Sequence, residues 1–190
     1  MKLYDYLDSG NGYKVRLTLA HLGLACEWTE CDILHGATRT PEFLARNPNG
    51  RIPLLELDDG TCLAESNAII WYLAEGSPLV PYERLARAQV LQWMFFEQYS
   101  HEPYVATPRY IVKHLPVGSP RRAELPDRLE RGRAAFTVME RHLTTRRFFV
   151  GERYTIADIS LYAYSHVAHE GGHDLAPFPH VRAWLDRVAD

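Results

Sequence analysis

The sequence has few cysteines, no long apolar run and almost no excess of charge. Its 190 residues contain three cysteines and no C-x-x-C pair, which excludes a disulfide-stapled scaffold and favours a reducing compartment. The longest unbroken apolar stretch, residues 68–74, is too short to cross a bilayer. The N-terminus carries acids at positions 5 and 8 in place of a signal peptide's apolar core. We therefore expect a soluble cytoplasmic protein.

The net charge of −3 provides no bulk attraction to nucleic acid or to an anionic membrane, so neither is expected as a partner. A hydrophobic content of 46% is enough for one large domain or two small ones. Residues 1–80 hold 6 basic and 11 acidic side chains, whereas residues 81–190 hold 15 and 13. This difference in charge balance indicates two domains.

Strand and helix signals alternate along the first 80 residues. The predicted strands are 2–7, 26–32, 52–57 and 61–64, and the last two are joined by the hairpin turn Asp58-Asp59-Gly60. The predicted helices follow the turn Ser9–Gly12, cover 41–45, and extend from Ser66 to about Glu75. The resulting order β-α-β-α-β-β-α is that of the thioredoxin fold.

Only helices are predicted in the second half, over 84–114, 121–143, 155 to about 170, and 179 to the end. The fold class is therefore an α/β thioredoxin-like N-terminal domain (1–77) and an all-α helical bundle (84–190), with a linker at 78–83. Four bulky residues in a row, Trp93–Phe96, span about 300° of a helix. Either that helix is nearly engulfed or one side of it meets another subunit.

Two short segments have the residue types of an anion site. Ser9-Gly10-Asn11-Gly12 begins a helix, where N–H groups, a hydroxyl and an amide favour negative charge. The same residues also make an ordinary turn and cap. Glu65-Ser66 begins another helix and is either a plain N-cap or a site for an amino acid, with Glu65 holding the ammonium group.

Three other motifs favour structure over chemistry. Thr155-Ile-Ala-Asp158 is a capping box. His169-Glu-Gly-Gly-His173 matches the zinc pattern H-E-x-x-H, but its two glycines are expected to end the helix and separate the histidines, so no metal is predicted. The three cysteines, Cys26, Cys31 and Cys62, occupy strand patterns and are expected to be small buried hydrophobes.

In combination, these segments resemble the glutathione transferase family. The matching runs are Ser9–Arg16, Arg39–Pro53, Leu63–Ile69 and Gly151–Asp158, in the right order and spacing. The most specific part is N-P-x-x-x-I-P ending at Pro53, followed twelve residues later by E-S-x-A-I.

The resemblance implies a role for each matching position. Ser9 and Asn11 are the candidates for activating the thiol, and the choice between them stays open. Pro53 resembles the family's cis-proline, with the Ile52 backbone pairing with the cysteinyl part of glutathione. Glu65 and Ser66 resemble the γ-glutamyl site. The remaining candidate contacts to glutathione are Gly12 and Arg51, with Arg51 assisted by His35 or Arg39.

The resemblance implies a glutathione transferase of the detoxification type. It would bind glutathione as co-substrate, direct the thiolate at a small hydrophobic electrophile, and act as a homodimer. The family mechanism requires a lower thiol pKa, because the thiolate is the nucleophile. The electrophile pocket is expected between the domains, from Tyr104, Arg109 and Tyr110.

Two alternatives remain open. One is glutathione-dependent reduction of disulfides or peroxides, which Asn11 favours, and the other is a non-catalytic binding module on the same fold.

Overall fold

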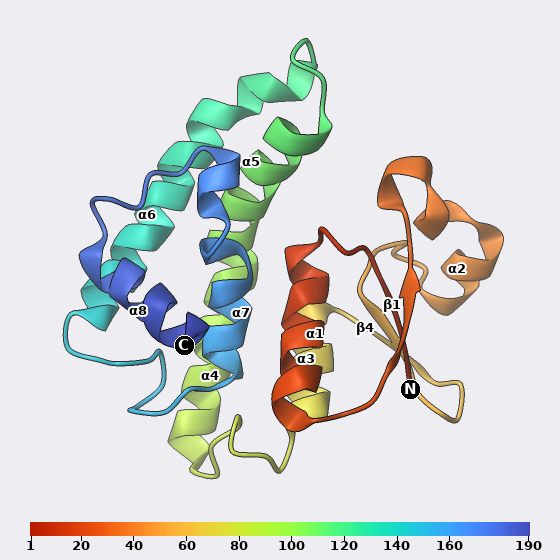
Figure 1. The fold of residues 1–190 in the computed structure, drawn as a ribbon, viewed down its shortest axis with the longest axis horizontal. Coiled ribbons are helices and arrows are strands. Elements are labelled where there is room, and N and C mark those ends of the chain that lie inside the picture. The colour runs from red at the N-terminus through yellow and green to blue at the C-terminus, as the bar shows by residue number, and fades with distance from the viewer. The chain divides into compact units, whose positions relative to one another are not determined.

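A computed structural model describes all residues from 1 to 190. The chain divides into two compact units, Met1–Val80 and Pro81–Asp190, and each is described by itself. The first unit contains every strand, and the second contains only helices and turns (Figure 1).

The first unit has the predicted order β-α-β-α-β-β-α, which is confirmed. Its regular elements are β1 (Lys2–Asp5), α1 (Gly10–Leu22), β2 (Glu27–Glu30), α2 (Pro41–Arg46), β3 (Leu54–Glu56), β4 (Cys62–Ala64) and α3 (Ser66–Ala74). Two short 3-10 turns, Ile33–His35 and Ala37–Arg39, lie between β2 and α2.

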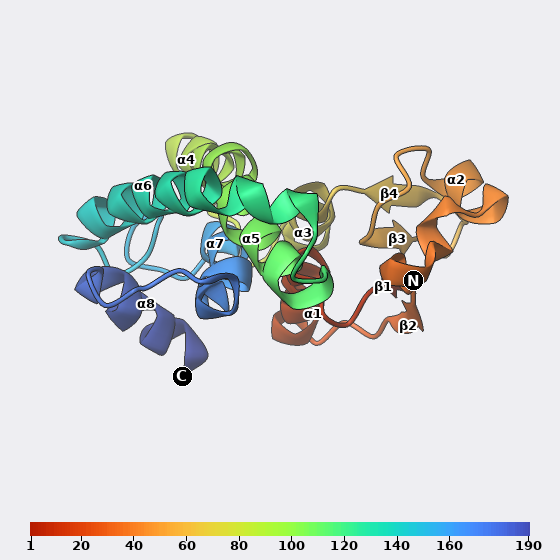
Figure 2. The same cartoon turned by 90° about the horizontal axis from the view of Figure 1, so that it is seen from above.

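The four strands form one mixed sheet in the order β2-β1-β3-β4, in which β1 is parallel to β2 and antiparallel to β3. Helices α1 and α3 cover one face and α2 covers the other (Figures 1 and 2). Successive side chains of β1 alternate between these faces. Tyr4 packs with Phe43 of α2, whereas Leu3 and Asp5 point toward α1. A carboxylate is thus placed on an otherwise apolar face.

Two predictions for this unit are corrected by the structure. The strands are shorter than predicted, so Cys26 and Cys31 flank β2 and do not belong to it. Ser66 is not the N-cap of α3 but its first helical residue, and the cap position belongs to Glu65. Glu65 has φ 69° and ψ 112°, which is an uncommon backbone conformation for a residue with a Cβ.

The second unit contains α4 (Arg84–Phe96), α5 (Glu102–His114), α6 (Leu125–Leu143), α7 (Ile156–Ser165) and α8 (Pro179–Ala189). A π-helical turn, Glu97–His101, connects α4 to α5, so the predicted helix 84–114 is continuous but widened at one turn. The prediction that the third helix reaches residue 170 is wrong. It ends at Ser165. The Tyr162 carbonyl accepts from both the backbone N–H and the ring Nδ1 of His166, and the next residue, Val167, has a non-helical backbone conformation.

Helix α7 is the centre of this bundle, because all ten of its residues are buried. The predicted capping box at its start is confirmed. The Asp158 carboxylate accepts hydrogen bonds from the backbone N–H groups of Thr155 (2.9 Å) and Phe149 (3.1 Å) and from the Trp184 indole (3.0 Å). One buried carboxylate therefore joins α7, α8 and the preceding loop.

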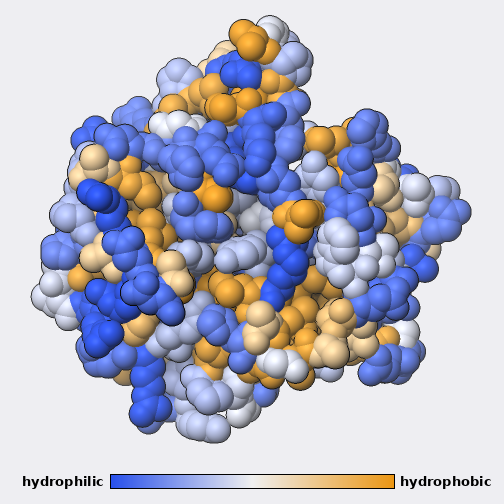
Figure 3. Space-filling model, in the orientation of Figure 1, coloured by the Kyte–Doolittle hydropathy of each residue, from blue (hydrophilic) through white to orange (hydrophobic).

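The aromatic run in α4 is neither engulfed nor entirely exposed. Trp93 and Met94 are buried, Phe96 is half-buried, and Phe95 is 70% exposed. Apolar areas also interrupt the polar covering on the face drawn in Figure 3. No helix in the chain combines the length and the hydropathy that a membrane span needs.

Candidate functional site

The turn between β1 and α1 is the first part of the candidate site. Ser9 is the N-cap of α1, and its Oγ accepts a hydrogen bond from the N–H of Gly12 at 3.2 Å. The capping interpretation of this turn is thus correct for Ser9. Because the hydroxyl is the acceptor in this bond, its own proton can still be donated to another group. The helix N-terminus adds its partial positive charge at the same place.

Asn11 and Ser66 are 55 positions apart in the sequence, yet their side chains lie together. Ser66 Oγ donates to Asn11 Oδ1 at 3.3 Å, and Lys14 Nζ donates to Ser66 Oγ at 3.4 Å. Asn11 is the second residue of α1 and Ser66 is the first of α3, so the N-termini of the two helices are adjacent. The structure therefore joins the two segments that the sequence marked as anion sites.

Asp5 lies behind this turn and is completely buried. It pairs with the Arg16 guanidinium, which also donates to the Leu7 carbonyl at 2.8 Å. Burial raises the pKa of Asp5 to about 6, although the Arg16 charge acts in the opposite direction. A Cβ added at Gly12 would lie 1.6 Å from Asp5 Oδ1, so only glycine fits there. The absence of a side chain at Gly12 therefore allows α1 to pack closely on β1.

The Ile52–Pro53 peptide bond is cis, as the resemblance implied. The loop before it is fixed by Asn47, which is only 5% exposed. Its Nδ2 donates to the Arg51 carbonyl at 2.8 Å, and its Oδ1 accepts from Asn49 N–H at 3.1 Å. The backbone that leads to Pro53 is therefore held by one buried amide.

The basic candidates near this loop have different surroundings. Arg51 is exposed, and Arg39 donates to the Asn49 carbonyl at 3.3 Å. His35 instead contacts Asp32, with 2.7 Å between Nδ1 and Oδ2, and its side chain is 82% exposed. The structure therefore brings Arg39 to the loop of Arg51, whereas the contact of His35 with Asp32 is local.

The three predicted pocket residues all lie on α5. Arg109 is buried and its Nε donates to Glu170 at 2.7 Å, which is a structural role inside the helical unit. Tyr104 accepts from Arg131 at 3.2 Å, and the Tyr110 ring lies 5.4 Å from that of His114. Their role toward a substrate remains a prediction.

The zinc motif does not assemble. The short helical turn ends at Gly171, and Gly172 has φ 94°. His173 is turned back onto the Tyr104 carbonyl at 2.9 Å, whereas His169 is exposed. No group of three or more His, Cys, Asp or Glu side chains is arranged to hold a metal ion.

The cysteines do not have the surroundings of a reactive thiol. Cys31 is buried, and Cys26 and Cys62 are half-buried. Burial raises the pKa of all three thiols, which disfavours the reactive thiolate. None of them lies in the turn at the start of α1.

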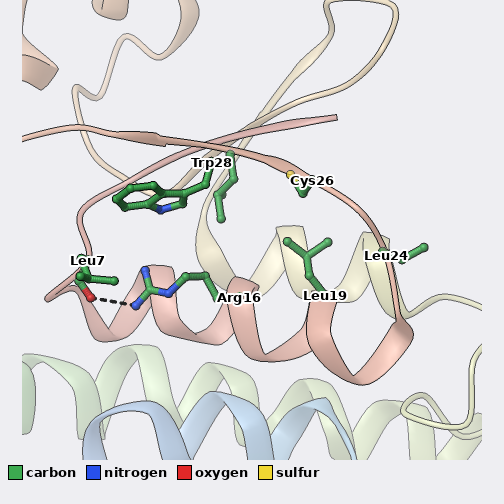
Figure 4. A pocket seen from close by; sticks show the side chains of 7 residues that line it. Leu7, Arg16, Leu19, Leu24, Cys26 and Trp28 are labelled. Carbon is green, nitrogen blue, oxygen red and sulfur yellow. Dashed lines mark hydrogen bonds between the residues drawn. The ribbon is translucent and has the colours of Figure 1, made fainter.

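A separate pocket of about 320 Å³ lies between α1 and the β1–β2 edge of the sheet (Figure 4). Its lining is mostly apolar and includes Leu19 and Trp28, together with Arg16, which reaches toward the Leu7 carbonyl. None of the site residues predicted from the sequence lines this pocket.

Sequence reasoning missed Asp5, Lys14 and Asn47. The sequence did contain a signal for Asp5: strand side chains alternate between the two faces of the sheet, and Asp5 falls on the same face as the apolar Leu3. Lys14 is likewise fully buried although it is charged. A polar residue at an apolar phase indicates a buried hydrogen bond, but its partner is distant in sequence.

Comparison with known proteins identifies the family of both units. The family described as "Glutathione S-transferase, N-terminal domain" matches residues 1–75, and "Glutathione S-transferase, C-terminal domain" matches residues 122–187. A crystal structure of glutathione S-transferase from Pseudomonas fluorescens Pf-5 is 55% identical with a TM-score of 0.96, covering 98% of this chain and 93% of that one.

Two curated relatives extend the comparison. Maleylacetoacetate isomerase from Rhizobium meliloti is 35% identical over 185 residues, which are 93% of this chain and 85% of the isomerase. Protein URE2 from Eremothecium gossypii is 31% identical over 98% of this chain, but the match spans only 64% of its length. This chain belongs to the glutathione S-transferase family, whose thioredoxin-like and helical domains correspond to its two units.

Proposed function

We propose that this chain is a glutathione transferase that binds glutathione at the adjacent N-termini of α1 and α3. The observation that carries the proposal is the Ser66–Asn11 hydrogen bond of 3.3 Å. Glutathione offers two anions to such a place, its γ-glutamyl carboxylate and its thiolate. Two helix N-termini stabilise both by their N–H groups and dipoles.

The thiol chemistry follows from the same arrangement. A thiol with a pKa of about 8.5 is only slightly ionised at pH 7. Lowering its pKa by two units requires about 2.7 kcal/mol of preferential stabilisation of the anion. A hydrogen bond from Ser9 or Asn11 and the dipole of α1 supply contributions of this size. The protein thus activates the thiolate of its co-substrate and directs it at a small electrophile.

Glutathione titration by calorimetry tests the binding site. Glu65→Ala removes the proposed partner of the α-amino group of the γ-glutamyl residue but keeps a Cβ at φ 69°, so the backbone is expected to be unchanged. We expect at least about tenfold weaker binding, the loss of one charged hydrogen bond. Glu75→Ala is the matched control, because it removes an exposed carboxylate at the other end of α3. Equal binding by both variants would contradict the site.

The electrophile is identified by turnover on three substrate classes with glutathione. A chloronitrobenzene tests aromatic substitution, and a small mixed disulfide tests the reductase that Asn11 favours. Maleylacetoacetate is included because the isomerase from Rhizobium meliloti is 35% identical. Ser9→Ala and Asn11→Ala are measured on each. If glutathione neither binds nor protects the protein thermally at high excess, the chain is a non-catalytic module.

We also propose that the chain is a homodimer. Leu91, Phe95 and Tyr99 are each separated by about one helical turn and are 36%, 70% and 83% exposed. An apolar row of this kind on a helix supports contact with a second copy. Sedimentation at low micromolar concentration is expected to show a species of twice 21.8 kDa.

A further inference from the structure

Lys14 is the most unusual residue beside the candidate site. Its side chain is 0% exposed, although lysine is almost never fully buried without a partner. It lies in α1, on the side that packs against α3, where Nζ meets Ser66 Oγ at 3.4 Å. Removing an ammonium group from water costs several kcal/mol unless hydrogen bonds compensate. The hydrogen bond from Lys14 to Ser66 therefore helps to offset the cost of burying this ammonium group.

The direction of these hydrogen bonds is fixed by chemistry. An ammonium group has three donors and no acceptor, so Ser66 Oγ must accept from Lys14. A serine hydroxyl has one proton, and Ser66 directs it to Asn11 at 3.3 Å. Only the oxygen of an amide accepts, so the oxygen end of Asn11 faces Ser66 and its NH2 group lies on the other side.

We propose that Lys14 is a positioning residue that fixes the amide of Asn11 so that its NH2 group, and not its oxygen, is presented to the sulfur of glutathione. This inference rests on the proposed function. Without the Lys14 donor, the Ser66 hydroxyl can accept from the Asn11 amide as readily as it donates to it, and the amide can rotate by 180°. A rotated amide places a carbonyl oxygen next to the sulfur, which disfavours the thiolate.

The inference also distinguishes the two candidates for thiol activation. Ser9 Oγ accepts from the Gly12 N–H, whereas the Asn11 oxygen accepts from Ser66 Oγ, which in turn accepts from Lys14. The Ser9 hydroxyl can still donate its own proton, but Asn11 is the donor whose orientation the Lys14–Ser66 pair controls. Asn11→Leu keeps the branched shape of the side chain, removes the NH2 group and adds no charge, so it should raise the thiol pKa as the loss of Lys14 does.

The test measures the thiol pKa of bound glutathione by ultraviolet thiolate absorbance in Lys14→Met, Lys14→Arg and Asn11→Leu. Lys14→Met keeps the chain length without a donor, and we expect a thiol pKa at least one unit higher than in the wild type. Lys14→Arg restores a donor and should recover at least half of that shift. Lys2→Met is the matched control, because it removes the same charge from β1, where Lys2 pairs with Glu27, and should match the wild type.

Coupling between the variants separates positioning from general stability. The double variant Lys14→Met/Asn11→Leu should shift the thiol pKa no further than Asn11→Leu alone, because both act through one NH2 group. Additive shifts, or a wild-type thiol pKa in Lys14→Met, overturn the inference while the proposed function stands. If bound glutathione keeps its solution pKa in the wild type, both fall. Should Lys14→Met not fold, a wild-type thiol pKa in Asn11→Leu overturns the inference equally.

Discussion

The contact between α1 and β1 gives the sharpest prediction for this fold. A Cβ at Gly12 would lie 1.6, 2.1 and 2.3 Å from the Oδ1, Cγ and Oδ2 atoms of Asp5. Real Cβ atoms essentially never approach other atoms within 3.0 Å, so Gly12→Ala forces a movement of more than 1 Å. Asp5 is fully buried and pairs with Arg16, so either this pair or the packing of α1 must give way.

The size of the effect follows from these two routes. Overpacking a buried site costs about 1–3 kcal/mol, and disrupting a buried ion pair costs about 3–5 kcal/mol. Alanine regains about 1 kcal/mol over glycine inside a helix. Because all three clashing atoms belong to the Asp5 carboxyl group, we expect the ion pair to be the part that gives way, and Gly12→Ala to lower the free energy of unfolding by about 2–4 kcal/mol. In an Asp5→Ala background all three clashing atoms are absent, and the same substitution should stabilise by about 1 kcal/mol.

The assay is a double-mutant cycle over the wild type, the two single variants and the double variant. Urea unfolding is followed by circular dichroism at one fixed protein concentration, so that any association contributes equally. The predicted coupling between the two positions is at least about 3 kcal/mol. Additive effects within about 0.5 kcal/mol would refute the proposed packing of Gly12 on Asp5.

Three further predictions follow from the buried carboxylates and the exposed aromatic row. Asp158→Ala leaves three buried N–H donors without their acceptor. Each unsatisfied donor costs about 1–3 kcal/mol, so urea unfolding should show the helical unit destabilised by at least about 3 kcal/mol. A loss below about 1 kcal/mol would contradict this. The pKa of Asp5 is raised from 3.8 to about 6, so the native state binds the extra proton between these values, and stability should fall by up to about 3 kcal/mol as the pH rises through that window. Asp5→Ala should remove this part of the pH dependence, and an unchanged profile would contradict it. Phe95→Glu should convert the dimer to a monomer in sedimentation with unchanged circular dichroism, whereas Val138→Glu, at a 47% exposed position on α6, should leave association unchanged.

The order of elements in the first unit was predictable because its signals are local. Gly23 ends α1 with φ 62°, and Gly60 turns the β3–β4 hairpin with φ 84°, conformations that glycine adopts readily. The capping box of α7 was predictable for the same reason, because Thr155 and Asp158 are three residues apart. In these places the chemistry of neighbouring residues determines the backbone.

The details of the site depend on contacts that no local pattern contains. Ser66 was expected to cap α3, but Glu65 adopts a positive φ and takes the cap position, which residue type alone does not indicate. The Ser66–Asn11 bond joins residues 55 positions apart.

The central claim is that bound glutathione ionises more readily than free glutathione, and one titration addresses it directly. Thiolate absorbance is followed against pH for the wild-type complex, and the complex with S-methylglutathione is subtracted to cancel the three protein thiols. We expect an apparent thiol pKa about two units below that of the free tripeptide. A pKa equal to the free value, at saturating glutathione, would contradict it.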